Sequence, residues 1–433
     1  MTLPPAPPPA PPTVPMVEVG ALPDGATVWR VAFSGPALSR VELSLRRDGP
    51  ITGRVAAMAA LWKEGTSAHP KGTWSEAVHA LGAEIAAGCG PARCWIDVDA
   101  PTAVMPEALS LAAELLQAPV FPGVAALRRR WRAEWRSDEF AGDTVADLAI
   151  GRRTFGDGHP YRRDHDGTFF CDMAHARRAW RDLLASATVG VVVVGDADPA
   201  ALGDADPAVL GAFPGHASPP APPPPDLVPG MLLVDIPGEA VARVRLAWEG
   251  PPRDAADAGA YALALRIVGG DFTGRLNRRL RETLGYTYGI YARHVDAPGW
   301  GLSTVEAEVP ADVLVPALGE IAAVLDDATF DLVDVDAARR AFLTEAAQET
   351  RAGIARPLTF EWIAGLRPGD TVRRVDALTH VSVAEVNEAA AHWLHGPRVW
   401  VVAGDAATLE PLLDASPLAP DAIWRACRAI GSC

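Results

Sequence analysis

The sequence lacks several features that would assign it at once to a class of protein. No apolar run is long enough and free enough of charge to span a membrane, so we expect no transmembrane helix. Five cysteines among 433 residues are few and odd in number, which argues against a disulfide framework. Cys89 and Cys94 flank Gly90-Pro91 and could form a local bridge or half of a metal site, but no second pair with ligand spacing accompanies them. The N-terminus lacks the basic and apolar blocks of a secretory signal, so a cytoplasmic location is the default expectation.

Positive charge is also scarce. Lys and Arg number 39 against 54 Asp and Glu, which gives a net charge of −15. Nucleic acid and anionic membrane surfaces are therefore not expected as partners, whereas a basic or weakly structured peptide is compatible with this charge. Nearly half of the residues are apolar, and a chain of this length suggests two or three domains.

Two proline tracts divide the chain. The first occupies residues 4–15 and the second begins at Pro219, and such tracts form extended spacers that cannot build a core. We therefore expect a Pro-rich tail over residues 1–15 and a Pro-rich linker over residues 215–230. The domains that they separate are expected at residues 16–214 and 231–433.

The two halves look like copies of one another. The segment Val191 to Asp196 recurs as Val399 to Asp405, and the two Gly-Asp pairs are 209 residues apart (405 − 196). The same offset carries the segment at Glu107 onto the one at Pro316, and Val41 to Leu45 resembles Val244 to Trp248. Three matches in the same order indicate a duplication.

Within each half, the hydrophobic pattern predicts two strands, then a long helical section, then a closing strand. This order is not a regular alternation of strand and helix. It predicts an α+β fold with two homologous domains, each a largely antiparallel sheet with helices packed on one face.

Residues 53–66 read Gly-Arg-Val-Ala-Ala-Met-Ala-Ala-Leu-Trp-Lys-Glu-Gly-Thr. Taken alone, this segment is an alanine-rich helix that packs closely against a sheet and ends at Gly65. A zinc-binding helix would need imidazoles at i and i+4 with a carboxylate between them. Ala56 and Ala60 have that spacing and Ala59 precedes the second of them, but alanine can neither bind a metal nor accept a proton.

This segment resembles the metal-binding helix of the insulinase/pitrilysin (M16) family of zinc peptidases, Gly-x-x-His-x-x-Glu-His-x-Leu-x-x-Gly-Thr, with alanine at the three chemical positions. Three further segments resemble family elements: Phe155 to Tyr161, the strand ending at Asp196, and Leu276 to Tyr286. The resemblance covers most of residues 40–400. It implies a distal glutamate ligand, for which only Glu134 is available, in a basic neighbourhood. We therefore expect no metal site and no cofactor in this chain, and we interpret His392 and His395 as structural.

A glycine pair and several tyrosines mark residues 269–291. Gly269-Gly270 is most simply a turn, Thr273 is a candidate N-cap, Gly285 would end the following helix, and a strand is expected over Tyr286 to Tyr291.

The resemblance implies that an Arg-x6-Tyr pair, matched here by Arg279 and Tyr286, contacts the substrate across a cavity from the zinc. A guanidinium and a phenol both donate hydrogen bonds, which suits them to stabilise a developing oxyanion. Weaker candidates for substrate binding are Gly269, Gly270 and Tyr288.

The resemblance implies a non-catalytic partner subunit of a heterodimeric zinc metallopeptidase. Its partner would be a chain with the His-x-x-Glu-His motif, which would hold the zinc, and Arg279 and Tyr286 would act on a peptide in trans. This chain alone would not be a metallopeptidase but part of an endopeptidase complex. Two alternatives remain: a structural or assembly protein of the same fold, and a homodimeric peptide-binding pseudoenzyme.

Overall fold

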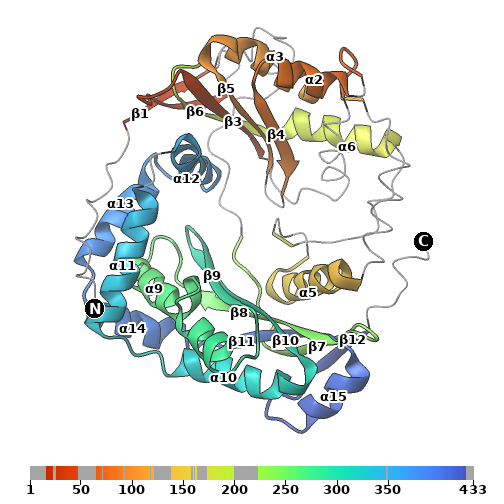
Figure 1. The fold of residues 1–433 in the computed structure, drawn as a ribbon, viewed down its shortest axis with the longest axis vertical. Helices are drawn as coiled ribbons and strands as arrows, with labels where there is room; N and C mark the ends of the chain where they lie inside the picture. The colour runs from red at the N-terminus through yellow and green to blue at the C-terminus, as the bar shows by residue number, and fades with distance from the viewer. Residues whose placement is uncertain are drawn as a thin grey trace.

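The computed structural model describes residues 16–22, 26–46, 65–70, 72–90, 93–117, 119–120, 138–157, 159, 161–162, 173–198, 223–347 and 350–425. These residues form two halves, each built on a six-stranded sheet. Figure 1 shows the sheets one above the other, with helices on the outer side of each and further helices between them.

In the N-terminal half, the described elements are, in chain order, β1 (Val17–Ala21), β2 (Thr27–Val31), β3 (Leu38–Arg46), α2 (Thr73–Ala80), β4 (Glu84–Cys89), β5 (Cys94–Pro101), η2 (Thr102–Val104), α3 (Met105–Gln117), α5 (Asp138–Thr154), α6 (Met173–Ser186) and β6 (Thr188–Val194). The strand order is β1-β2-β6-β3-β5-β4. Only the pairing of β2 with β6 is parallel. The sheet is therefore largely antiparallel, as the sequence predicts.

The C-terminal half contains β7 (Gly230–Asp235), β8 (Val241–Gly250), α9 (Ala258–Leu265), η4 (Arg266–Gly270), η5 (Asn277–Thr283), β9 (Ile290–Ala297), β10 (Trp300–Pro310), η6 (Ala311–Val313), α10 (Leu314–Asp326), α11 (Leu332–Ala346), α12 (Arg351–Ile363), α13 (Asp370–Ala377), η7 (Leu378–His380), α14 (Val383–Trp393), β11 (Arg398–Gly404), α15 (Ala406–Asp414) and β12 (Ala422–Arg425). Its strand order is β12-β7-β11-β8-β10-β9.

Five strands of each sheet follow the same plan. The closing strand, β6 or β11, lies parallel to β2 or β7 and antiparallel to β3 or β8. The sixth strands differ, since β1 is antiparallel to β2 and β12 is parallel to β7. The helices α3 and α10 begin at Met105 and Leu314, which differ by the offset of the sequence repeat, 314 − 105 = 209. This correspondence confirms the prediction of an α+β fold made of two homologous domains.

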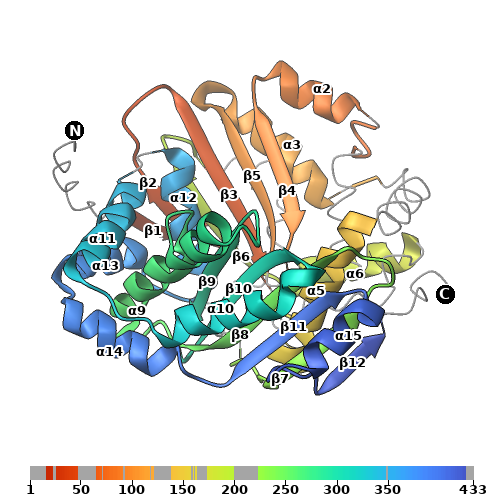
Figure 2. The same ribbon diagram turned by 60° about the horizontal axis from the view of Figure 1, so that its bottom comes forward.

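Each half has its own apolar core between its sheet and its outer helices. In the N-terminal half, Leu109 and Leu115 of α3 pack on Leu43 and Ile96 of the sheet. In the C-terminal half, α9, α10 and α14 cover the corresponding face. Figure 2, which is turned by 60°, shows α10 lying across the strands of this sheet. The helices of each half therefore pack on one face of its sheet.

The opposite face of each sheet is covered by a helix from the other half. Ala355, Leu358 and Trp362 of α12 pack against apolar side chains of β2 and β6. Reciprocally, the residues of α5 pack on β7 and β11. Since α5 and α12 occupy equivalent positions in the repeat, the halves exchange equivalent helices (Figure 1).

Polar contacts fix this exchange. Thr359 of α12 donates a 2.7 Å hydrogen bond to the buried carboxylate of Glu42. In the other direction, Arg245 of β8 donates to Asp143 and Asp147 of α5 at 2.7 and 2.9 Å. Losing both contacts of Arg245 would leave its half-buried charge without these partners, which is costly. Losing Thr359 would remove one hydrogen bond from the buried Glu42, which would still be paired with Arg40 at 2.7 Å. The helices are therefore held by charge as well as by apolar packing.

Cys89 and Cys94 form a disulfide at the end of the β4–β5 hairpin, so the local bridge is the alternative that the fold adopts. Disulfides persist mainly in oxidising compartments, which weighs against the expected cytoplasmic location. Among the helices that the structure describes, none is long and apolar enough to cross a membrane. The location of the protein stays a prediction.

Candidate functional site

The segment that resembles the family's metal-binding helix, with Ala56, Ala59 and Ala60, lies outside the described residues, as does Glu134. Within the part of the chain that the structure describes, no group of three or more His, Cys, Asp or Glu side chains could hold a metal ion. The residues present do not fit a zinc site, because alanine supplies no ligand. The candidate site is therefore the segment from Gly269 to Tyr291.

The glycine pair lies where the backbone is tightly packed. Gly269 is the non-helical residue within the π-helical segment η4, with φ −164°, and a Cβ there would lie 2.9 Å from Leu276 and 3.1 Å from Ala292. A Cβ on Gly274 would in turn lie 2.9 Å from the Cα of Gly269. Gly269 is buried, whereas Gly270 is exposed and lines a cavity of about 460 Å³. The glycines therefore serve a tight turn, and Gly270 alone is accessible to a ligand.

The helix after this turn begins differently from the prediction. Asp271, not Thr273, supplies the capping carboxylate, since its Oδ1 accepts hydrogen bonds from the backbone N and the hydroxyl of Thr273 at 2.8 and 2.5 Å. These bonds lower the pKa of Asp271 despite an opposing effect of burial. The Asp271 side chain therefore fixes the start of the helix that carries Arg279.

Arg279 faces the neighbouring helix α10. Its Nε and Nη2 donate to the two carboxylate oxygens of Glu320 at 2.7 and 2.6 Å. These hydrogen bonds raise the pKa of Arg279 and lower that of Glu320, so both groups stay charged. The Arg279 side chain is 43 % exposed, and it lines a shallow groove with Arg275 and Arg278. Contact with a peptide would require Arg279 to exchange Glu320 for the substrate.

The helix ends at Gly285, whose φ of +67° confirms its predicted role. The N–H of Tyr286 returns to the carbonyl of Leu280 at 2.7 Å, and the Tyr286 side chain is half-buried against the C-terminal core. The strand predicted over Tyr286 to Tyr291 begins only at Ile290. This expectation was wrong because Thr287 accepts from Gly289 N and donates to Gly289 O, which forms a local turn.

Asn277 fixes the loop between Gly285 and Gly289. This side chain is fully buried; its Nδ2 donates to Ile290 O at 2.7 Å and to Asp271 O at 3.0 Å, and its Oδ1 accepts from Ile290 N at 3.1 Å. One amide thus joins both ends of the segment. Sequence reasoning missed Asn277, and only its polar character within a helical pattern could have drawn attention to it.

The loop presents Tyr288 to solvent. Its side chain is 99 % exposed, whereas Thr287 beside it is buried. Near it in the chain, the guanidinium of Arg281 lies 4.7 Å from the ring centre of Phe272, which is half-exposed and meets Tyr291 edge-on at 5.4 Å. Arg281 and Tyr288 have the same Arg-x6-Tyr spacing as Arg279 and Tyr286. The segment therefore contains two such pairs, and the second is the more accessible.

This arrangement can bind a chain of mixed character. Tyr288 and Arg281 can donate hydrogen bonds to a peptide carbonyl, and Phe272 with Tyr291 offers an aromatic surface for an apolar side chain. Phe272 and Arg281 were not singled out from the sequence, because single exposed residues carry no periodic pattern. The structure brings them together through the turn at Asp271.

The histidines that were interpreted as structural are explained in part. Both ring nitrogens of His395 approach backbone oxygens, Ala391 O and Asp326 O, at 3.0 Å. His392 lies tilted beside the ring of Trp393 with the centres 4.5 Å apart. His395 therefore joins α14 to α10, and neither residue belongs to the segment around Tyr288.

Part of the chain matches a known protein family. Residues 174–341 match the family described as "Peptidase M16 inactive domain". This region runs from α6 to α11 and includes the whole candidate site. No curated protein matches the sequence.

Several solved structures share the fold. A peptidase M16 inactive domain from Pseudomonas fluorescens superposes with a TM-score of 0.77 at 22 % identity, covering 90 % of this chain and 98 % of the other. A protease from Helicobacter pylori gives 0.71 at 14 % identity and covers 90 % and 100 %. The periplasmic protease PqqL from Escherichia coli gives 0.70 at 15 % identity, covering 91 % of this chain and 46 % of its own. At these identities, the likeness establishes the fold alone.

Proposed function

We propose that this chain, which matches the peptidase M16 inactive domain family over residues 174–341, is the non-catalytic, substrate-binding subunit of a heterodimeric zinc metallopeptidase. The zinc and the His-x-x-Glu-His motif would belong to a partner chain of the same family. This chain would hold a peptide substrate and direct hydrogen-bond donors to it in trans. Alanine at residues 56, 59 and 60 supports the assignment of the metal to another chain.

One observation carries the proposal: the 99 % exposed Tyr288 is held on a loop that the buried Asn277 anchors. A large aromatic side chain gains nothing for folding when it is left in water. Asn277 holds the Ile290 end of the loop, and the hydrogen bond from Tyr286 N–H to Leu280 C=O holds the other end. This anchoring costs conformational freedom that a peptide would otherwise have to remove on binding. This combination is expected of a contact residue for a ligand and not of a purely structural segment.

The predicted pair Arg279 and Tyr286 and the pair Arg281 and Tyr288 are both candidates for these contacts. Exposure favours the second, because Tyr286 is half-buried and Arg279 is engaged by Glu320. We propose that Tyr288 and Arg281 make the direct contacts. Arg279 and Tyr286 would then act at the edge of the site, after Arg279 has left Glu320.

The test reconstitutes cleavage. The partner is obtained by co-purification, its sequence is checked for His-x-x-Glu-His, and kcat/KM is measured with a fluorogenic peptide. Tyr288→Phe removes one hydroxyl donor and should lower kcat/KM about 100-fold if this donor stabilises the oxyanion. Arg281→Ala should weaken binding of the peptide as well.

Matched controls come from the same segment. Tyr291→Phe removes a hydroxyl from the aromatic cluster and should leave kcat/KM unchanged, and Arg279→Ala with Tyr286→Phe tests the other pair. If all four tyrosine and arginine variants of the two pairs keep full kcat/KM, the proposal of a trans-acting site is wrong. If only Arg279 and Tyr286 matter, the pair predicted from the sequence is the correct one.

The alternatives predict different results. A structural or assembly protein would form a complex whose peptide cleavage is unaffected by every one of these variants. A homodimeric pseudoenzyme would form a stable self-dimer whose size in light scattering does not change when the zinc-bearing chain is added.

A further inference from the structure

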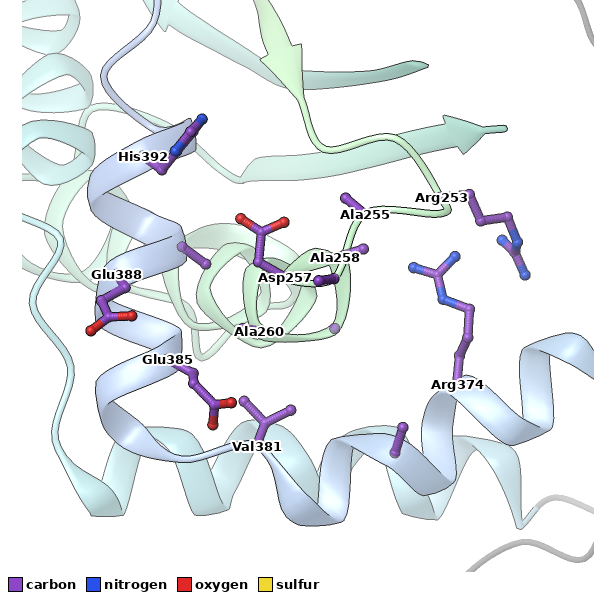
Figure 3. A pocket seen from close by; sticks show the side chains of 14 residues that line it. Arg253, Ala255, Asp257, Ala258, Ala260, Arg374, Val381, Glu385, Glu388 and His392 are labelled. Carbon is purple, nitrogen blue, oxygen red and sulfur yellow. The ribbon is translucent and has the colours of Figure 1, made fainter. Parts of the chain in front are cut away.

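A cavity that is distant in sequence from the loop of Tyr288 lies among the helices of the C-terminal half; we call it the charged cavity. It encloses about 550 Å³ between the start of α9, one side of α14 and the end of α13 (Figure 3). This volume lies within the range of pockets that hold small organic ligands. Nothing in the proposed function uses it.

Charges of opposite sign lie on opposite sides of this cavity. In Figure 3 the guanidinium of Arg374, on α13, and the carboxylate of Glu385, on α14, approach it from opposite sides. Val381 and Ala258 line the cavity between them. A simple anion would meet three carboxylates, those of Asp257, Glu385 and Glu388, and a simple cation would meet two arginines. The lining therefore suits a molecule that carries both charges.

Arg374 is held in place and still has donors to offer. Its Nη1 donates to Asp296 Oδ2 at 2.7 Å, and Asp296 is also bound by the buried Arg253 at 3.0 Å. Asp370 binds Arg253 from the other side. Among the described residues, the side chain of Arg374 makes no other hydrogen bond, so most of the five N–H groups of its guanidinium remain for a ligand. A fixed guanidinium of this kind suits a carboxylate.

Glu385 is the counterpart at the other end. Its Oε2 caps α14 by accepting from the backbone N and the hydroxyl of Ser382, both at 2.7 Å. These bonds fix the carboxylate and lower its pKa. Within the described residues, Oε1 has no partner and is free to accept a hydrogen bond from an ammonium group.

The mainly apolar cavity of about 460 Å³ that Gly270 lines adjoins the charged cavity at Arg374. The two share Arg253, Gly259 and Arg374, and the second is lined by apolar side chains that include Leu265, Phe342 and Leu378. Gly259 lies at the junction of the two cavities. A Cβ at this position would lie 3.2 Å from Leu378, so glycine keeps the junction open. A group bound beside Arg374 can therefore place an apolar substituent in the cavity lined by Leu265 and Phe342.

From these contacts we infer that the paired cavities bind a short zwitterionic peptide with an apolar C-terminal residue. Its carboxylate lies on Arg374, its C-terminal side chain occupies the cavity of Leu265 and Phe342, and its ammonium group lies toward Glu385. The inference stands on the chemistry of the cavities and does not depend on the proposed role of Tyr288.

The probe is the dipeptide Ala-Leu, titrated into the full chain by calorimetry or by protein-observed NMR. Saturable binding is expected in the millimolar range or tighter. Ala-Leu amide and N-acetyl-Ala-Leu each lose one charge and should bind at least about tenfold more weakly. Ala-Asp, with a charged C-terminal side chain, should also bind more weakly than Ala-Leu.

Two variants locate the site. Arg374→Ala should weaken Ala-Leu binding at least about tenfold, while Arg373→Ala, one residue earlier on the same exposed turn of α13, should leave it unchanged. Loss of Arg374 also removes one of the hydrogen bonds to Asp296, so a second variant is needed that keeps all the charges. Ala262→Phe serves this purpose, because its side chain fills the apolar cavity. Circular dichroism and thermal melts check that each variant folds.

The inference is overturned if Ala-Leu shows no saturable binding, or if Arg374→Ala and Ala262→Phe, both folded, bind it as the natural chain does. Inorganic phosphate is titrated in parallel. Phosphate binding that competes with Ala-Leu at equal affinity and depends on Arg374 would identify a simple anion site and would also overturn it.

Discussion

Replacing Asn277 tests how the candidate site is held. In Asn277→Leu, a side chain of similar size loses three hydrogen bonds and leaves two buried backbone groups, Ile290 N–H and Ile290 C=O, without this partner. The third acceptor, Asp271 C=O, keeps the N–H of Gly274 at 3.1 Å. A buried polar group without a partner costs about 1 to 3 kcal/mol, so the free energy of unfolding should fall by about 2 to 6 kcal/mol.

The assay has a local and a global part. Denaturant unfolding gives the loss of stability, and amide hydrogen exchange follows the N–H of Ile290, which should exchange about 100-fold faster because about 3 kcal/mol of protection is lost. Peptide cleavage in the reconstituted complex should also fall, since the loop of Tyr288 loses its anchor.

Asn387→Leu provides the matched control. Asn387 joins the backbone of Phe330 in the same way, accepting from its N–H at 2.7 Å and donating to its C=O at 3.0 Å, but it lies half-buried on α14. This variant should lose stability without any change in the exchange of Ile290 or in cleavage. The reasoning is refuted if Asn277→Leu loses less than about 1 kcal/mol and Ile290 keeps its protection.

Two further predictions concern the sheets. Burial, with the nearby Glu42 carboxylate, raises the pKa of Asp97 to about 6 from 3.8, against the opposing effect of Arg40. The folded state therefore binds a proton more tightly than the unfolded one, so the free energy of unfolding should rise by roughly 3 kcal/mol as pH falls from above 6 to below 4. Denaturant titrations across that range should show no such rise in Asp97→Asn. Equal pH profiles for the two proteins would contradict the prediction. Gly190→Ala should destabilise the folded protein by about 1 to 3 kcal/mol, because its Cβ would lie 2.1 Å from Trp362 of α12. If the exchanged helix is the cause, this loss should largely vanish in a Trp362→Leu background. Strict additivity of the two changes in thermal or denaturant unfolding would count against this explanation.

Local pattern was sufficient for the repeated architecture. The offset of 209 residues between the Gly-Asp pairs predicted two homologous halves, and the equivalent strand orders confirm them. Gly285 ended its helix as expected because the positive φ there favours glycine, a preference that acts within one turn. These features depend on neighbours in sequence, so a single chain reveals them.

The exchange of helices was not predicted. The run Val191 to Val194 is apolar at every position, which is typical of a strand buried on both faces, and this pattern could have indicated a second cover for the sheet. It could not have identified the cover as α12, which lies more than 150 residues later (351 − 194 = 157). Partners at that distance are selected by shape and charge across the fold.

The sequence by itself determined the duplicated α+β framework, the alanines without ligating atoms at positions 56, 59 and 60, and the presence of an arginine and tyrosine segment. Only the tertiary structure decided which of those side chains are accessible, placing Arg279 against Glu320 and leaving Tyr288 in solvent. The physical reason is that helix and strand periodicity depend on a few consecutive residues, whereas exposure depends on buried anchors such as Asn277 that join distant parts of the backbone.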